Sequence, residues 1–200
     1  MFAQVIDGRT NDRAALRRRF DAWASEVEPG AVGFEGSTVV CGDDGRFIVV
    51  ARFESADAAR RNSERPEQDA WWRETEPLVE SEARFRESDD IELVFGGGSD
   101  DAGFVQVLET QPRDRKHLLS LERSFVDEMK AHRPELLGLV RIWHGPGSAT
   151  EVVYFTSEAE AREGESKDVP TEHADAVAEY ERLLDPVEFV DTADPWMISA

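Results

Sequence analysis

The sequence predicts an α+β protein made of two tandem copies of one βαββαβ unit. The first observation behind this prediction is a match of the chain with itself at an offset of 102 residues. Phe2–Ile6 then falls on Phe104–Leu108, and Phe53–Ser55 falls on Phe155–Ser157. The second is that strand-like and helix-like hydrophobic patterns follow in the same order in both halves. Matches kept in order along a whole half indicate a duplicated unit.

Between the two copies lies a segment rich in glycine, serine and aspartate, a composition that is typical of a flexible linker. No P-loop lysine follows these glycines, so a linker is preferred to a phosphate-binding loop. The predicted division is a first unit at 1–95, a Gly-rich linker at 96–103 and a second unit at 104–200.

Each element of the first unit has its own signal. Residues 2–6 alternate between two faces, as a strand does. Asn11 is placed to cap a helix whose apolar residues recur at helical spacing up to Val27, and Ser55 is placed to cap a second helix. The remaining predicted elements are strands at 32–41 and 46–53, a helix at 68–81 and a strand at 83–87.

The second unit repeats this order. Its predicted elements are a strand at 104–108, a helix that ends before Pro134, strands at 138–144 and 150–156, a helix capped by Ser157, a helix at 169–184 and a strand at 187–191. Two further short runs, 91–95 and 196–198, are predicted to be extra strands that cross to pair with the opposite unit.

The βαββαβ order is typical of a ferredoxin-like unit, in which an antiparallel four-stranded sheet is covered by helices on one face. The other face of such a sheet needs a partner, because an exposed apolar sheet invites association. We therefore expect the two units to pack sheet to sheet as an intramolecular dimeric α/β barrel. This internal pseudo-dimer leaves further oligomerisation open.

Composition and charge exclude several classes of protein. The chain has 200 residues and a net charge of −20, which both halves share. A field of that sign repels nucleic-acid phosphates and anionic lipid, so we expect no nucleic acid and no membrane among the partners. No apolar run approaches the roughly 20 residues that span a bilayer. The single Cys41 and the absence of a secretory pattern at the N-terminus predict a cytoplasmic protein.

Four segments carry a resemblance to a known family. Residues 45–55 lead from a strand into a helix, residues 59–72 end in Trp71-Trp72, and residues 154–157 and 194–196 support the same match. Together these segments resemble the dimeric α/β-barrel superfamily, in particular antibiotic-biosynthesis monooxygenases, and tandem-repeat actinobacterial proteins of unassigned function. The resemblance covers essentially the whole chain. It implies the barrel fold, and it implies a range of activities that includes cofactor-free oxygenases, haem degraders and members without catalysis.

Paired polar residues are the candidates for lining a cavity. Gln4 and Gln106 coincide at the 102-residue offset, each with apolar neighbours on the same strand face, and are expected either in the barrel lumen or at its wet mouth. Arg52 and Tyr154 also coincide and would bind a carbonyl, phenolate or carboxylate if they point into a cavity. The competing interpretation is an Arg that reaches solvent and a Tyr at the sheet edge.

His144 is the candidate catalytic residue, because it is the one histidine in a strand context and imidazole titrates near neutral pH. The competing interpretation is a histidine that merely adjoins a turn. Trp71 and Trp72 are adjacent on a helix and differ by about 100° in direction. One is expected in the core and the other at a cavity mouth or interface. No metal-ligand spacing and no nucleotide-binding fingerprint occurs, so we expect no metal site and no cofactor.

The function that these observations favour is a cofactor-independent, monooxygenase-like enzyme, or a binder, of a small hydrophobic or aromatic molecule. The alternative is a non-catalytic ligand-binding or structural barrel. Haem binding or degradation is a third hypothesis, since haem degraders of this superfamily use an Asn on the first strand with a Trp and a His on a later helix. Here Gln4 and Gln106 stand at the Asn position, the first unit has no His, and His173 in the second unit has no accompanying Trp.

Overall fold

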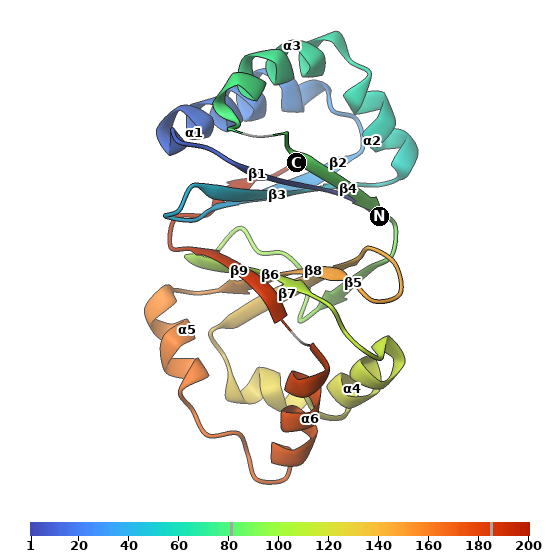
Figure 1. The fold of residues 1–200 in the computed structure, drawn as a ribbon, viewed down its shortest axis with the longest axis vertical. Helices are drawn as coiled ribbons and strands as arrows, with labels where there is room; N and C mark the ends of the chain where they lie inside the picture. Colours follow the sequence, from blue (N-terminus) through green and yellow to red (C-terminus); the bar gives the residue numbers. More distant parts are fainter. Residues whose placement is uncertain (81, 185) are drawn as a thin grey trace. The chain divides into compact units, whose positions relative to one another are not determined.

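The structure is a computed structural model that describes residues 1–80, 82–184 and 186–200. The chain forms two compact units, one of Met1–Ile91 with Asp194–Ala200 and one of Glu92–Ala193. Each unit contains a five-stranded sheet with its helices on one face (Figure 1). The predicted α+β class with two ferredoxin-like units is confirmed. The sheet-to-sheet packing of the two units stays a prediction.

The first unit has the strand order β10-β2-β3-β1-β4, in which the four strands of the repeat are joined by a fifth from the end of the chain. Short turns of π- and 3₁₀-helix follow α1 at Trp23–Val27 and Glu28–Gly30, and one 3₁₀ turn follows α3 at Glu76–Leu78. Its elements are β1 (Phe2–Arg9), α1 (Arg13–Ala22), β2 (Phe34–Cys41), β3 (Arg46–Phe53), α2 (Ala56–Ser63), α3 (Pro66–Thr75), β4 (Arg84–Ser88) and β10 (Trp196–Ile198).

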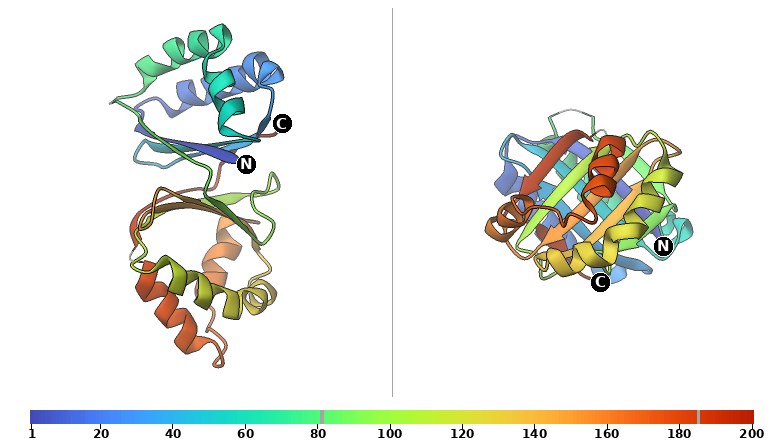
Figure 2. Two further views of the ribbon diagram at one scale, coloured as in Figure 1. Left: turned by 90° about the vertical axis from the view of Figure 1, so that its right-hand side faces the viewer. Right: turned by 90° about the horizontal axis from the view of Figure 1, so that it is seen from below.

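The second unit has the matching order β5-β7-β8-β6-β9. Helices α4 and α6 lie next to each other on one face of this sheet, as the turned view also shows (Figure 2). Its elements are β5 (Ile91–Val94), β6 (Phe104–Thr110), α4 (Arg115–His132), β7 (Leu136–Trp143), β8 (Ala149–Phe155), α5 (Glu158–Glu165), α6 (Ala174–Leu184) and β9 (Pro186–Thr192).

Several helix boundaries differ from those expected, among them the start of α3, which begins at Pro66 rather than 68. The cap of α1 is Asp12 and not Asn11, because the Asp12 carboxylate accepts a hydrogen bond from the Ala15 backbone N–H at 2.8 Å. Helix α3 ends at Thr75. The 3₁₀ turn after it contains a proline, which lacks the backbone N–H that a continuing α-helix would need as a hydrogen-bond donor. The expected end of that helix at Ser81 lies outside the described residues. Helix α6 begins at Ala174 rather than 169.

The two extra strands do cross between the units, as predicted. β10 pairs antiparallel with β2, and β5 is the neighbour of β7. The compact units therefore differ from the expected division at 95 and 104. The first unit includes β10 from the end of the chain, and the second includes β5, which precedes residue 95. Arginines of the first helix in each unit bind these segments. Arg13 and Arg17 of α1 pair with Asp194, just before β10, and Arg115 of α4 pairs with Glu92 of β5.

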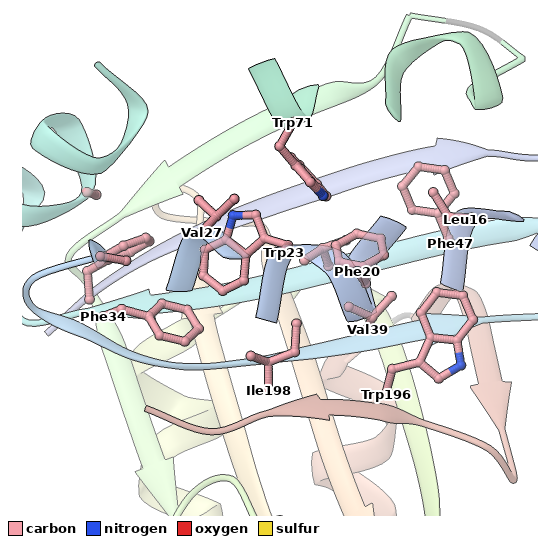
Figure 3. Packing of buried hydrophobic residues seen from close by; sticks show 14 of the residues in the cluster. Leu16, Phe20, Trp23, Val27, Phe34, Val39, Phe47, Trp71, Trp196 and Ile198 are labelled. Carbon is pink, nitrogen blue, oxygen red and sulfur yellow. The ribbon is translucent and has the colours of Figure 1, made fainter. Parts of the chain in front are cut away.

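The helix-covered face of the first sheet carries an aromatic core. Strand alternation and register place Phe2, Ile6, Val49 and Phe53 on this face. Figure 3 shows aromatic side chains from α1, the π turn after it and α3 meeting this face, with two residues of β10 closing the group. Among the described residues, no helix is long and apolar enough to cross a membrane.

Candidate functional site

A cleft opens between α3 and the edge of the first sheet formed by β1 and β4. Its outer groove has a volume of about 400 Å³. The β1–β4 register sets Gln4 beside Glu87 and Ile6 beside Phe85, so these four side chains form the sheet side of the groove. The groove is lined by Gln4, Ile6, Asn62, Ser63, Gln68, Asp69, Trp71, Trp72, Phe85 and Glu87.

The groove continues inward into a cavity of about 60 Å³ between the helices and the sheet. Gln4, Ile6, Asn62, Gln68 and Trp71 line both spaces, so the two are parts of one site. The inner walls are mostly aromatic and aliphatic, with few polar groups, which is typical of a site for a small organic molecule. The cavity is completed by Phe20, Trp23, Phe34, Ser37, Val49, Ala51, Phe53 and Ile198.

The adjacent tryptophans of α3 have different surroundings. Trp71 is buried, and its ring packs edge-on against Phe20 (Figure 3). Its indole N–H donates to the Arg19 carbonyl at 2.6 Å. Trp72 is half-buried, and its ring meets the exposed Phe85 of β4 at 5.5 Å between centroids. Trp71 therefore forms an inner wall, and Trp72 with Phe85 forms an apolar rim.

A chain of hydrogen bonds fixes Asn62 and Gln68, two of the amide side chains that line the site. Arg65 at the α2–α3 corner donates to Asn62 Oδ1 at 3.0 Å and to the Val27 carbonyl at 3.0 Å. Asn62 Nδ2 donates to Gln68 Oε1 at 3.3 Å, and Trp23 Nε1 donates to the same oxygen at 2.7 Å. Because Pro66 starts α3 directly after Arg65, the corner is rigid and holds both amides in the wall of the cavity.

Among the described residues that line the site, the carboxylates belong to the outer groove. Glu87 accepts a hydrogen bond from Gln4 Nε2 at 2.8 Å, and Asp69 pairs with Arg73 at 3.1 Å. Among the described residues that line the groove and cavity there is no His, Cys, Met or Tyr, the side chains that ligate haem iron. The lining residues therefore do not fit a haem group. Within the described part of the chain, no group of three metal-ligating side chains gathers.

The equivalent space in the second unit has a different character. The 102-residue offset matches its sheet and first helix to those of the first unit, strand by strand. Three positions that are apolar in the first unit, Phe20, Val39 and Val49, are charged in the second. Their counterparts are Glu122, Arg141 and Glu151.

Arg141 is fully buried in this second-unit space and is satisfied by acidic partners. Its guanidinium donates to Glu122 at 2.8 Å, to Glu151 at 3.1 Å, to Glu92 at 3.2 Å and to the Tyr180 hydroxyl at 3.0 Å. Burial alone lowers the pKa of Arg141, but the carboxylates of Glu151 and Glu122 hold it well above its usual value. Burial and the nearby Glu151 raise the pKa of Tyr180.

Gln106 also has different partners from Gln4. Its Nε2 donates to Glu165 of α5 at 3.2 Å. Arg162 of the same helix pairs with Asp191 of β9 at 2.7 Å and stacks over the Phe104 ring at 5.1 Å. Gln106 is thus bound by a side chain of α5, whereas Gln4 is bound by Glu87 of β4 and lines the groove. The expected equivalence of Gln4 and Gln106 holds for their strand position and not for their surroundings.

The structure brings together three of the residues predicted from sequence, Gln4, Trp71 and Trp72. The expectation that Gln4 faces a lumen between sheets is wrong, because strand alternation puts it on the helix-covered face with Phe2 and Ile6. Arg52 lies on the opposite face of the same sheet, with Ile48 and Val50 as predicted.

Tyr154 and His144 belong to the second unit, and neither is among the residues that line the first-unit cleft. Tyr154 is buried and lies on the strand face opposite to Glu151. His144 Nε2 lies 2.8 Å from the Thr150 hydroxyl, which donates to Glu109 at 2.8 Å. This hydrogen-bonded chain orients the imidazole and keeps His144 as a separate candidate base.

Sequence reasoning missed Asn62, Gln68 and Phe85 as lining residues. The spacing of Asn62 and Gln68 around Pro66 is a detectable signal of a helix corner, but it does not say that both amides turn inward. Phe85 lies in a predicted strand, and nothing in its local pattern indicates that it meets a tryptophan of α3.

Comparison with solved structures adds a fold assignment. A proposed monooxygenase from Lactobacillus acidophilus NCFM superimposes with a TM-score of 0.74 at 10% identity, over 99% of this chain and 96% of the other. A proposed monooxygenase from Fusobacterium nucleatum superimposes with a TM-score of 0.69 at 8% identity, over 95% of this chain and 90% of the other. The chain has the fold of these monooxygenase-like proteins. An anthrone oxidase-like protein superimposes with a TM-score of 0.63 at 11% identity, over 100% of this chain and 94% of the other.

The predicted resemblance to monooxygenase-like α/β proteins is thereby confirmed at the level of the fold. At sequence identities of 8–11%, the roles of residues in these structures are not assigned to residues of this site. No protein-family profile matches the chain, and no curated protein matches it.

Proposed function

We propose that the protein is a monooxygenase-like enzyme that binds a small hydrophobic or aromatic molecule in the first-unit cleft and needs no cofactor. One observation carries the binding half of the proposal. An open groove leads into an apolar, tryptophan-walled cavity that contains only a few fixed polar groups. Such a site desolvates a flat apolar ligand and orients it through the few polar atoms.

The catalytic half rests on the fold and on what a cofactor-free oxygenase requires. An electron-rich substrate must lose a proton to form a carbanion or enolate that reacts with O₂ directly. Glu87 is our candidate proton acceptor, because it lines the groove and is held by Gln4 at 2.8 Å. The aromatic inner wall would keep bulk water from the reactive intermediate.

Anthrone is the test substrate that the comparison with an anthrone oxidase-like protein suggests. One anthrone and one O₂ give one anthraquinone and one water. The two methylene hydrogens leave as protons, one oxygen atom becomes the new carbonyl, and the other leaves in water. The substrate supplies the electrons that O₂ accepts, so no external reductant is needed.

The experiment measures O₂ uptake and anthraquinone formation with full-length protein and anthrone, with no flavin or nicotinamide added. We expect saturable uptake above the slow autoxidation seen with heat-denatured protein. Equal rates with native and denatured protein would remove the oxygenase proposal for this substrate. Equilibrium dialysis of anthrone in the absence of O₂ measures binding separately.

The second candidate function is a non-catalytic binder of the same class of molecule. It is favoured by the absence of histidine from the described residues that line the cleft. Binding of anthrone without turnover would support it.

We propose the cytoplasm as the location, because the single Cys41 is a free, buried thiol that suits a reducing compartment.

A further inference from the structure

The Gln68 carboxamide has an orientation that its neighbours impose. An indole N–H and a guanidinium can only donate hydrogen bonds. The atom that faces Trp23 Nε1 at 2.7 Å must therefore be the Gln68 oxygen, and the atom that faces Arg65 at 3.0 Å must be the Asn62 oxygen. The Asn62 nitrogen then faces Gln68 Oε1 at 3.3 Å, which agrees with the first assignment. Two donor-only groups thus fix both amides.

This arrangement leaves the Gln68 nitrogen on the other side of the carboxamide. Both donors are bound to Oε1, so the NH₂ group points away from Trp23 and Asn62. Among the described residues, the structure shows no hydrogen bond from Gln68 Nε2. Gln68 lines both the outer groove, which mixes polar and apolar side chains, and the inner cavity, whose surface is mostly apolar.

We propose that Gln68 Nε2 is the hydrogen-bond donor that receives an oxygen atom of the ligand, so that the cleft selects aromatic ketones or enolates over hydrocarbons of the same shape. This inference rests on the proposed function and names the group that sets its specificity. A donor whose carboxamide is held by two neighbouring side chains is pre-organised and loses little entropy on binding. A hydrocarbon analogue that displaces water from this N–H returns no hydrogen bond to it, so the site favours the ligand that carries an oxygen atom.

In a reaction of the proposed kind, the same N–H would stabilise the substrate as it loses its proton. Deprotonation next to a carbonyl moves negative charge onto the carbonyl oxygen. A fixed N–H in a largely apolar site stabilises that charge more than water does at an exposed site. Gln68 would therefore both position the ketone and lower the barrier for proton loss.

The test compares 1-tetralone with tetralin, two bicyclic molecules that differ by one carbonyl oxygen. Equilibrium dialysis gives the Kd of each for the full-length protein, for Gln68→Glu and for Ala70→Glu. The carboxylate that Gln68→Glu introduces still accepts from Trp23 and Asn62 but has no N–H to offer. Ala70 is exposed on the same helix, and its substitution adds the same charge outside the cleft.

We expect the wild type to bind tetralone at least about tenfold more tightly than tetralin. Gln68→Glu should weaken tetralone binding about tenfold or more while leaving tetralin binding within about twofold, and Ala70→Glu should change neither. Unchanged tetralin binding also shows that the variant is folded.

Two outcomes would overturn the inference in distinguishable ways. If Gln68→Glu keeps the wild-type preference for tetralone, Gln68 is not the donor, while the cleft stays a binding site. If the wild type binds neither compound at millimolar concentration, the proposed binding function fails, and the role of Gln68 fails with it.

Discussion

Val39 and Arg141 occupy the same position in the two sheets, on the helix-covered face of β2 and β7. Val39 packs in the aromatic core of the first unit, whereas Arg141 is buried among three glutamates and a tyrosine. Two copies of one fold thus fill the same space with opposite chemistry. The apolar first unit leaves a cavity that a ligand can enter. In the second unit, Arg141 and the surrounding acidic side chains pair with one another.

This asymmetry predicts one ligand per chain. Isothermal titration with anthrone or 1-tetralone should give a stoichiometry near one, because the cavity and groove lie in the first unit and Arg141 with its acidic partners occupies the matching space of the second. Trp72→Ala should weaken binding by roughly 1 kcal/mol, since it removes one ring of the apolar rim. The matched control is Trp143→Phe in the second unit, which should leave the affinity unchanged. A stoichiometry of two would contradict the asymmetry.

Removing Arg141 alone should destabilise the protein strongly. Arg141→Val leaves Glu122 and Glu151 with no counter-charge, and breaking a buried pair in this way costs roughly 3–5 kcal/mol. Urea unfolding followed by circular dichroism measures the loss. The triple variant Arg141→Val, Glu122→Phe, Glu151→Val copies the first unit and should recover most of it. Arg162→Val is the control, because its pairs are exposed and contribute at most about 1 kcal/mol. Equal losses for Arg141→Val and Arg162→Val would refute a special role of the buried cluster.

Asp7 should make stability depend on pH in the acidic range. Burial alone would raise the pKa of Asp7, but hydrogen bonds from Arg46 and Arg84 outweigh it and lower the pKa below its usual value. A lowered folded-state pKa contributes stability that is present above the unfolded-state pKa and is lost as the pH falls through the folded value. Asp7→Asn should therefore cost roughly 1–3 kcal/mol at pH 7, and the difference from wild type should shrink below about pH 4. A difference that stays constant from about pH 7 to about pH 2.5 would show that the charge is not responsible.

The crossing strand β10 should support ligand binding from the far end of the chain. Ile198 lines the inner cavity, and Trp196 packs against Phe20 with 5.9 Å between ring centroids. Trp196→Ala should lower the free energy of unfolding by roughly 3–5 kcal/mol, and Ile198→Ala by roughly 2–5 kcal/mol, with weaker tetralin binding in both. Val32→Ala, at a position that is 76% exposed, should stay within about 0.5 kcal/mol of wild type. Wild-type affinity in both strand variants would separate β10 from the site.

Glu87→Gln should separate turnover from binding. If Glu87 accepts the substrate proton, the amide should reduce anthrone oxidation by about 100-fold, in the range typical of general bases, while the Kd changes little. Asp89→Asn, an exposed neighbour beyond the end of β4, is the control and should keep full activity. A Glu87→Gln variant with wild-type turnover would move the proton acceptor elsewhere in the groove, and Asp69, the other carboxylate that lines it, is then the next residue to test.

The sequence by itself determined the duplication, the order of strands and helices, and the crossing of the short runs at 91–95 and 196–198. These features follow from local signals: alternation along strands, helical spacing, caps and a repeat offset. It also selected Gln4, Trp71 and Trp72 among the residues of the cleft. The cap at Asp12 was missed by one residue, because Asn11 and Asp12 are both good capping residues and only the backbone geometry decides between them.

Only the tertiary structure decided which face of each sheet the helices cover, and so it moved Gln4 from an expected lumen to the cleft. Alternation groups residues on one face but does not say what covers that face. The same holds for Arg141, whose partners come from β5, α4, β8 and α6 and are distant in sequence. The direction of the Gln68 amide likewise depends on Trp23 and on Asn62 held by Arg65. Long-range contacts of this kind depend on how the elements pack, which no local pattern specifies.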